Sequence, residues 1–242
     1  MKKYTLLILL FFGQYAIYAQ KIALDTIWVK RYGWAYKDGM TGTDLMLQFV
    51  YPNGTDSIAQ HIREDITKKF FETNTISPLD ESCKVLLENS FGNMWIGLRI
   101  KTYLYRYSAV KIVNNKTLDY IIYHNQIVGC GDGTRSYSYC YSLLTGNRIT
   151  IDSLFCQSAQ SKVIKLLQSR HDDYYEKRSE EDRKMHRDIK HLDNFILLPK
   201  GLMFIYNPYE IGFGYEGGFR YTVKFSEIRQ FLKPQAIGYF FE

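Results

Sequence analysis

Tyrosine occupies every second position in two stretches of this chain: Tyr103, Tyr105 and Tyr107, and then Tyr137, Tyr139 and Tyr141. Side chains two residues apart share one face of a β-strand, and tyrosine favours such pleated, half-buried surfaces. With 21 tyrosines and 16% aromatic residues in all, the composition favours sheet. A row of this kind can stack on sugar rings or form a packed sheet face with its phenols at the solvent edge. We favour the packed face.

Helical patterns separate the strand-like segments. Apolar residues at a spacing of four predict an amphipathic helix over residues 57–72, capped by Asp56 or Ser57. A second helix is expected to open at Pro78. The segments 95–113 and 118–127 are typical of an antiparallel pair joined at Asn114-Asn115, and the order sheet, helix, sheet, helix, sheet, helix follows for the whole chain.

The N-terminus has the order of a secretory signal peptide. Lys2 and Lys3 precede a short apolar run, and Ala19 ends a stretch of small residues, so we expect residues 1–19 to be removed. The 16 residues from Tyr4 to Ala19 would span roughly 24 Å as a helix, against about 30 Å of hydrocarbon. We therefore expect a periplasmic or secreted protein with no retained transmembrane helix.

The net charge argues against nucleic acid as a partner. The formal charge is +6, and removal of Lys2 and Lys3 leaves 29 basic against 25 acidic side chains. These charges are scattered, whereas a nucleic-acid site needs a concentrated basic face. The densely charged segment 171–190 mixes both signs, which predicts a solvated helix or helical lid. Within it, Asp182 and His186 could share a metal, but an ion pair is the interpretation we favour.

Four cysteines remain in an exported chain, an even number that permits two disulfides. Cys130 and Cys140 flank a glycine-rich turn, so a bridge between these two is one prediction; four buried thiols are the alternative. No pair of cysteines has the CxxC spacing of a zinc or thioredoxin-like site.

Motifs that carry catalysis are absent from the sequence, and no cofactor is expected. Residues 212–217 match GxGxxG literally, but a strand-like segment follows them instead of a helix, so we interpret the match as a glycine-rich turn. Asp132 and Glu210 also lie beside glycine-rich turns. Two carboxylates can perform acid–base chemistry if they meet, although hydrogen bonding within the turns is the expected role.

Three segments carry a resemblance to a known family. They are the tyrosine and glycine-rich turn over 123–133, the turn, strand and helix start over 143–155, and the stretch that includes Asn194-Phe195 and 201–211. In order and content they resemble the RsiV-type extracytoplasmic domain of lysozyme-sensing anti-sigma factors, which also accompanies PdaC-type peptidoglycan deacetylases. Residues 20–115 resemble the PdaC-type N-terminal region, and residues 116–242 the RsiV-like domain. Two departures fall on turns: Gly129-Cys130-Gly131-Asp132 lacks the family's histidine, and Phe213-Gly214 stand where the family often has Ala-Pro.

The resemblance implies an α+β fold of mixed, mainly antiparallel sheets with flanking helices. It also implies an exported, non-enzymatic binding module of the cell envelope, with a lysozyme-like protein or a peptidoglycan fragment as partner. The alternative is a hydrolase or deacetylase acting on wall glycan, so the question of enzymatic activity stays open, with binding favoured. The chemistry and placement of the turns make Asp132, Arg135, Tyr209, Glu210 and Tyr215 the candidate binding residues.

Overall fold

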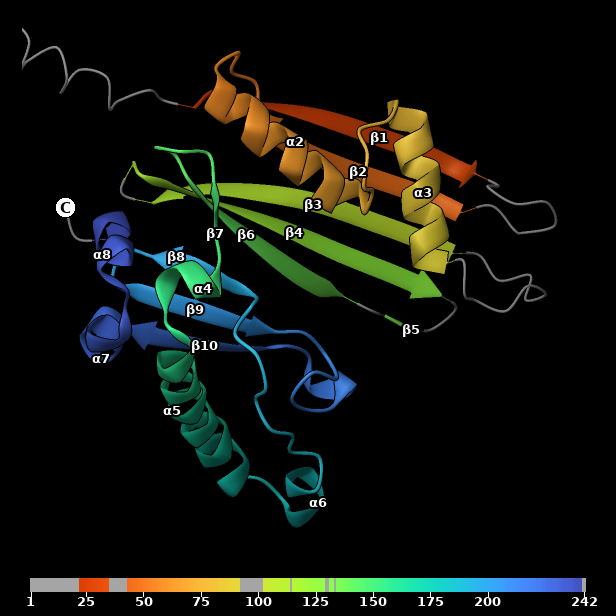
Figure 1. Ribbon diagram of the computed structural model, residues 1–242. Helices are drawn as coiled ribbons and strands as arrows, with labels where there is room; N and C mark the ends of the chain where they lie inside the picture. The colour runs from red at the N-terminus through yellow and green to blue at the C-terminus, as the bar shows by residue number, and fades with distance from the viewer. Residues whose placement is uncertain are drawn as a thin grey trace, which may run out of the picture.

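The computed structural model describes residues 22–34, 43–91, 102–113, 115–128, 131–132 and 134–240. These residues form two β-sheets with helices on their outer faces (Figure 1). All strand pairs but one are antiparallel among those described, so the predicted α+β class with mainly antiparallel sheets is confirmed. The predicted signal peptide, residues 1–19, lies outside the described residues.

The first sheet has the strand order β1-β2-β3-β4-β6-β7, with β5 paired to β4. Its strands are β1 (Leu24–Trp34), β2 (Thr43–Pro52), β3 (Thr102–Val113), β4 (Thr117–Val128), β5 (Gly131–Asp132), β6 (Arg135–Ser142) and β7 (Arg148–Ile149). The predicted antiparallel pair is confirmed, since β3 and β4 pair along their whole lengths, from Thr102 opposite Val128 to Val113 opposite Thr117. The predicted division between residues 115 and 116 thus falls inside this hairpin, and one sheet contains strands from both predicted parts.

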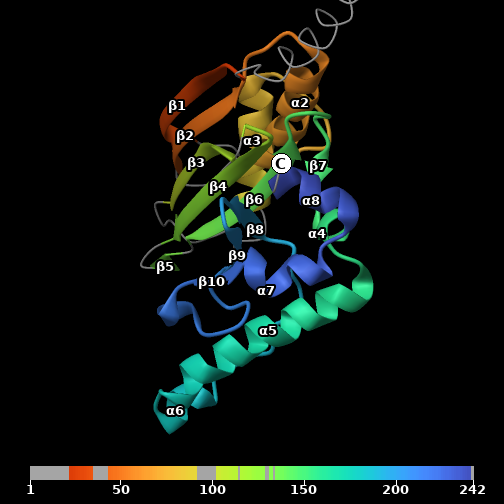
Figure 2. The same cartoon turned by 90° about the vertical axis from the view of Figure 1, so that its left-hand side faces the viewer.

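Helices α2 (Ser57–Phe71) and α3 (Leu79–Phe91) cover one face of the first sheet (Figures 1 and 2). Asp56 caps α2 as predicted, because its side chain accepts a hydrogen bond from the Ala59 amide. The spacing of four places Ile62 and Ile66 in the core, where they pack with Leu45 and other inward side chains of the sheet. The two predicted N-terminal helices are therefore confirmed.

The second sheet has the order β10-β9-β8 and is built from β8 (Phe195–Leu198), β9 (Gly201–Tyr206) and β10 (Phe219–Lys224). The helices around it are α4 (Ile151–Leu154), α5 (Gln157–Glu176), α7 (Phe225–Ile228) and α8 (Pro234–Phe240), with a 3-10 turn η3 (Arg229–Phe231). Apolar side chains of α5, such as Val163 and Leu167, pack with Leu202 and Phe204 of β9 in a second core. None of the helices formed by the described residues has the length and apolar character needed to cross a membrane.

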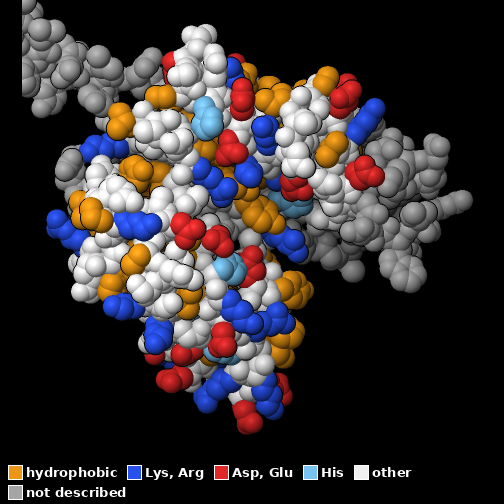
Figure 3. Space-filling model, in the orientation of Figure 1, with side chains coloured by type: hydrophobic (Ala, Val, Ile, Leu, Met, Phe, Trp, Pro, Cys, Tyr) orange, Lys and Arg blue, Asp and Glu red, His pale blue; other side chains and the backbone are white. Residues whose placement is uncertain are grey.

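The charged segment 171–190 is not one continuous helix. The helix α5 ends at Glu176, and the single turn α6 (Glu180–Arg183) follows before an irregular strap. Figure 3 shows acidic and basic side chains interspersed over this end of the molecule. Glu180 and Lys184, one helical turn apart, form an ion pair at 3.8 Å on the surface, which agrees with the predicted solvated segment.

The two sheets are joined on the side of the first sheet that faces away from α2 and α3. The Ser138 hydroxyl of β6 donates to the Phe195 carbonyl of β8 at 2.6 Å, and the Leu197 amide donates to the Asp119 carboxylate at 2.9 Å. These contacts place the second sheet over β4 and β6. Over β1 to β3 the same face carries exposed side chains, of which Trp28 is 63% accessible.

Candidate functional site

A pocket of about 390 Å³ lies where the two sheets meet, and we call it the inter-sheet pocket. Strands β4, β6, β9 and β10 supply its walls, and the loop between β9 and β10 supplies its rim. Its lining residues are Tyr123, Thr134, Arg135, Ser136, Ile205, Tyr206, Asn207, Pro208, Gly214, Gly217, Gly218, Phe219 and Arg220. The pocket thus lies between two turn regions of the sequence: the turn that precedes β6, and the glycine-rich turn that precedes β10.

Arg135 and Arg220 are the two charged residues among those that line the inter-sheet pocket. Arg135 opens β6 and Arg220 lies on β10; both are exposed, and neither forms an ion pair with a carboxylate of the described residues. No Asp or Glu is among the residues that line the pocket. Guanidinium groups in such a setting favour carboxylate or phosphate ligands, which they bind through paired hydrogen bonds. Arg135 is a predicted site residue. Arg220 was not predicted, because nothing in the residues around a single arginine in an alternating strand indicates a binding site.

The floor of the pocket depends on Asn207, which sequence reasoning also missed. Its Oδ1 accepts from the Ser136 amide at 2.7 Å, so a side chain of the β9–β10 loop completes the hydrogen bonding of β6. Asn194 makes a similar link, since its Nδ2 donates to the Ser136 carbonyl at 2.8 Å. Buried amide–backbone bonds of this kind hold the two sheets at a fixed separation.

The glycine-rich turn forms the rim and is not a phosphate-binding motif. It contains the three-residue 3-10 turn η2 (Gly214–Glu216) and leads into β10, so no helix follows it, as predicted. Gly217 has φ +75°, which disfavours other residues. A Cβ on Gly218 would lie 2.7 Å from the Tyr206 carbonyl oxygen. The glycines therefore allow a close backbone turn at the edge of the pocket.

Tyr209 and Glu210, two of the predicted site residues, shape the rim without lining the pocket. Tyr209 is 61% exposed, has φ +71°, and its carbonyl accepts from Arg187 Nη1 at 2.7 Å. Its ring lies over Gly214, where an added Cβ would come within 2.1 Å of the tyrosine Cζ. The Glu210 carboxylate accepts from the Asn207 amide at 2.8 Å and so closes the turn.

Asp132 and Tyr215 stay predictions, because the structure describes only their backbone. Asp132 belongs to β5 and pairs with Ile127, and Tyr215 is the middle residue of η2. The enzymatic alternative requires the Asp132 and Glu210 carboxylates to meet, and only the second is described, in its turn-closing role. Within the described part of the chain, no group of three or more His, Cys, Asp or Glu side chains could hold a metal ion.

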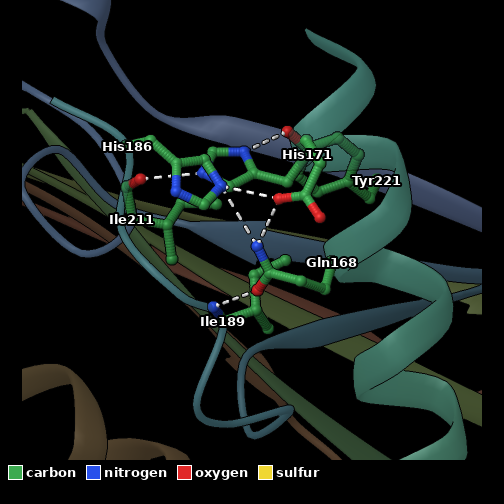
Figure 4. Close-up of polar contacts among 7 residues, drawn as sticks. Gln168, His171, His186, Ile189, Ile211 and Tyr221 are labelled. Atoms are coloured by element: carbon green, nitrogen blue, oxygen red, sulfur yellow. Dashed lines mark hydrogen bonds and ion pairs between the residues drawn. The ribbon is translucent and has the colours of Figure 1, made fainter. Parts of the chain in front are cut away.

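A polar cluster on α5 anchors the loop that carries the rim (Figure 4). His171 is fully buried; its Nε2 donates to the Ile211 carbonyl at 2.9 Å and its Nδ1 accepts from the Tyr221 hydroxyl at 2.7 Å. Burial lowers the pKa of His171, so the ring stays neutral, as this pattern of one donor and one acceptor requires.

His186 has a different partner from the predicted one. It bonds to the Asp172 carboxylate at 2.7 Å and stacks on His171 at 4.8 Å, whereas Asp182 interacts with Ser179 at the start of α6. The predicted Asp182–His186 pair is therefore wrong. The pair assumed a continuous helix, and the break after Glu176 turns His186 back toward α5.

The predicted Cys130–Cys140 bridge is not present, because Cys140 is a free thiol; Cys130 itself lies outside the described residues. The Cys140 Sγ donates to the Phe195 carbonyl at 3.4 Å, and complete burial raises the pKa of this thiol well above its usual range. Cys140 pairs with Asp119 in the interior of the sheet, about 17 Å along β6 from Arg135 at the strand's start. The Cys140 thiol therefore lies where it can contact β8, and too far along β6 to bridge the turn that precedes this strand.

Comparisons with known proteins agree with this architecture. Residues 152–226 match a family model described as "Protein of unknown function (DUF3298)". A crystal structure of a DUF3298 family member from Bacteroides fragilis shares 19% identity, with 89% of this chain and 95% of that chain covered and a TM-score of 0.72. A DUF3298 family protein from Pseudomonas aeruginosa shares 8% identity, with coverage of 90% and 98% and a TM-score of 0.67. No curated protein matches this chain. These structures share the fold.

Proposed function

We propose that this protein is an exported, non-enzymatic binding module of the cell envelope, related to the RsiV-type and PdaC-type extracytoplasmic regions. Its ligand would be an anionic fragment of the cell wall, held in the inter-sheet pocket. The signal-peptide pattern over residues 1–19 supports a periplasmic or secreted location. The resemblance to modules that act outside the membrane supports the same location.

The observation that carries the proposal is that Arg135 and Arg220 both line one concave site whose lining residues include no Asp or Glu. These residues are far apart in the sequence and come from different sheets. Two guanidinium groups that form no ion pair with a carboxylate of the described residues favour an external anion. The turns that line the pocket supply backbone groups, which are the kind of uncharged hydrogen-bonding group that fixes a ligand's orientation in such a pocket.

The named partners can be tested directly by calorimetry. The exported protein is titrated with soluble muramyl-peptide fragments and, separately, with lysozyme, and co-elution is measured in parallel. We expect heat from the fragments, and a loss of affinity of about tenfold or more for Arg135→Gln and Arg220→Gln, since a hydrogen bond to a charged group contributes about 1.5–3 kcal/mol.

The matched control is Arg63→Gln, on α2 at the opposite face of the first sheet. It should bind the fragments as the wild type does. If neither fragments nor lysozyme give heat or co-elution, the proposal is refuted. If the fragments bind but both arginine variants keep full affinity, the ligand does not use the inter-sheet pocket. Binding to lysozyme with no binding to fragments would make a protein the partner.

A further inference from the structure

The open face of the first sheet carries an aligned row of side chains that leads into the inter-sheet pocket. Strand register places five residues opposite one another across five strands, and we call them the cross-strand row: Trp28, Gln48, Tyr107, Tyr123 and Ser136. At about 4.8 Å between neighbouring strands, the row extends for roughly 19 Å. All five alternate with residues such as Val29 and Leu47 that face the helices.

The row connects two hollows without interruption. Tyr123 and Ser136 line the inter-sheet pocket. Trp28, Gln48 and Tyr107 line a second hollow of about 170 Å³ over β1, β2 and β3. Between the hollows, the Tyr107 and Tyr123 rings stack with their centroids 4.6 Å apart, so an elongated ligand would meet a continuous aromatic surface.

Exposure along the row is unusual for large aromatic side chains. Trp28 is 63% accessible and Tyr107 is 45% accessible. These two flank Gln48, and their Cα atoms are two strand spacings apart, about 10 Å. The flat face of a sugar ring can pack on each of these aromatic rings at about 3.5–4 Å. The Gln48 amide and the tyrosine hydroxyls then provide hydrogen bonds to polar substituents at the ring edges.

Charge along the row has one sign. Lys30 lines the outer hollow, Arg135 and Arg220 line the inter-sheet pocket, and neither set of lining residues includes Asp or Glu. This arrangement is complementary to a ligand that carries several negative charges along its length. A peptide would gain its backbone hydrogen bonds at a sheet edge, whereas the face of a sheet offers ring surfaces and side-chain groups.

We propose that the cross-strand row is the binding track for an acidic glycan strand, whose sugar rings pack on Trp28 and Tyr107 and whose carboxylates meet Lys30 and the arginines of the inter-sheet pocket. This inference rests on the proposed function, because it extends the same site from a pocket for one anionic group to a track for a chain of sugars. The track adds length dependence to binding, which the pocket alone does not require.

Trp28 provides a direct reporter of the track. The chain has three tryptophans, so the double variant Trp34→Phe, Trp95→Phe leaves Trp28 as its single one. The probes are peptide-free glycan strands of alternating N-acetylglucosamine and N-acetylmuramic acid, eight sugars or two sugars long. Chitohexaose serves as the neutral glycan and poly-glutamate as the acidic peptide. Calorimetry and Trp28 fluorescence are measured for each probe.

We expect the eight-sugar strand to change Trp28 emission and to bind more tightly than the disaccharide. Trp28→Ala and Tyr107→Ala should each weaken the long strand about 3- to 10-fold and leave the disaccharide unaffected, whereas Arg135→Gln should weaken both. The control Leu144→Ala removes a side chain of similar exposure, 62%, from a turn outside the row and should change neither.

Separate outcomes refute the track and the pocket. Equal affinity for the two glycan lengths, together with full affinity in Trp28→Ala, refutes the track and leaves the proposed function in place. Tighter binding of poly-glutamate than of the long glycan would make the ligand a peptide. If the wild-type protein is a dimer and Trp28→Ala is a monomer, a second copy of the chain covers the row. Either result refutes the track. No binding of any acidic probe refutes the proposed function as well.

Discussion

Replacement of Asp119 by Asn should stabilise this protein at alkaline pH. Asp119 lies on β4, is fully buried, and accepts a hydrogen bond from the Leu197 amide of β8 through Oδ2. Its Oδ1 has no hydrogen-bond partner among the described residues. Burial without full compensation disfavours the ionised carboxyl and raises the pKa of Asp119 from 3.8 to about 6.

The size of the effect follows from this shift. Because the folded-state pKa is raised, the favourable contribution of the neutral carboxyl is complete below pH 3.8 and is lost as pH rises through about 6. At about 1.4 kcal/mol for each pKa unit, the ionised form costs about 3 kcal/mol above that range. The added amide N–H of Asn needs an acceptor, which offsets about 1 kcal/mol. A net gain of about 2 kcal/mol is therefore expected at pH 8.

Urea unfolding of wild type and Asp119→Asn at a series of pH values from 4 to 8 measures this gain. The difference in unfolding free energy should grow by about 3 kcal/mol across the series and level off above pH 7. The same substitution at the exposed Asp188 should give no such growth. A variant no more stable than wild type at pH 8, or a difference that does not depend on pH, would show that Asp119 is not a strained buried carboxyl.

Three further outcomes are expected. Burial, and after it the charge of the neighbouring Arg106, lower the pKa of His124 from 6.5 to about 4. The free energy of unfolding should therefore fall by up to about 3 kcal/mol as the pH drops from 6.5 to below 4. Urea unfolding should show a smaller fall over the same pH range in His124→Gln. Gly218→Ala should lower the melting temperature and cost about 1–3 kcal/mol, since its Cβ meets the Tyr206 backbone oxygen; an unchanged melting temperature would contradict this. A thiol reagent should label Cys156 in the folded protein, because it is exposed and a hydrogen bond from Ser158 lowers its pKa, whereas Cys140 should react only on unfolding; equal labelling rates would show that the buried thiol opens freely.

Local patterns were sufficient for several features of the fold. The Asp56 cap and the spacing of four located α2, and turn residues located the β3–β4 hairpin. The glycine-rich segment 212–217 could be recognised as a turn because a strand pattern follows it. Each of these depends on interactions between residues a few positions apart, which a single sequence records directly.

The candidate site shows where such patterns stop. Arg135 lay beside a turn and could be proposed, but nothing near Arg220 or Asn207 in the sequence marks them. Their importance comes from the packing of the second sheet over β6, which is set by hydrogen bonds between distant residues such as Ser138 and Phe195. Periodicity gives the face of a strand and does not say which other face will cover it.

The two tyrosine rows show the same division. Their alternation alone determined that each lies on one face of a strand, because side chains in a strand have a period of two. The tertiary structure decided which face: Tyr137, Tyr139 and Tyr141 pack toward α2, where Tyr141 donates to Asp65 at 2.7 Å. Tyr107, in contrast, is on the open face. Strand register and the position of the second sheet make this choice, and both arise from contacts that no short stretch of sequence contains.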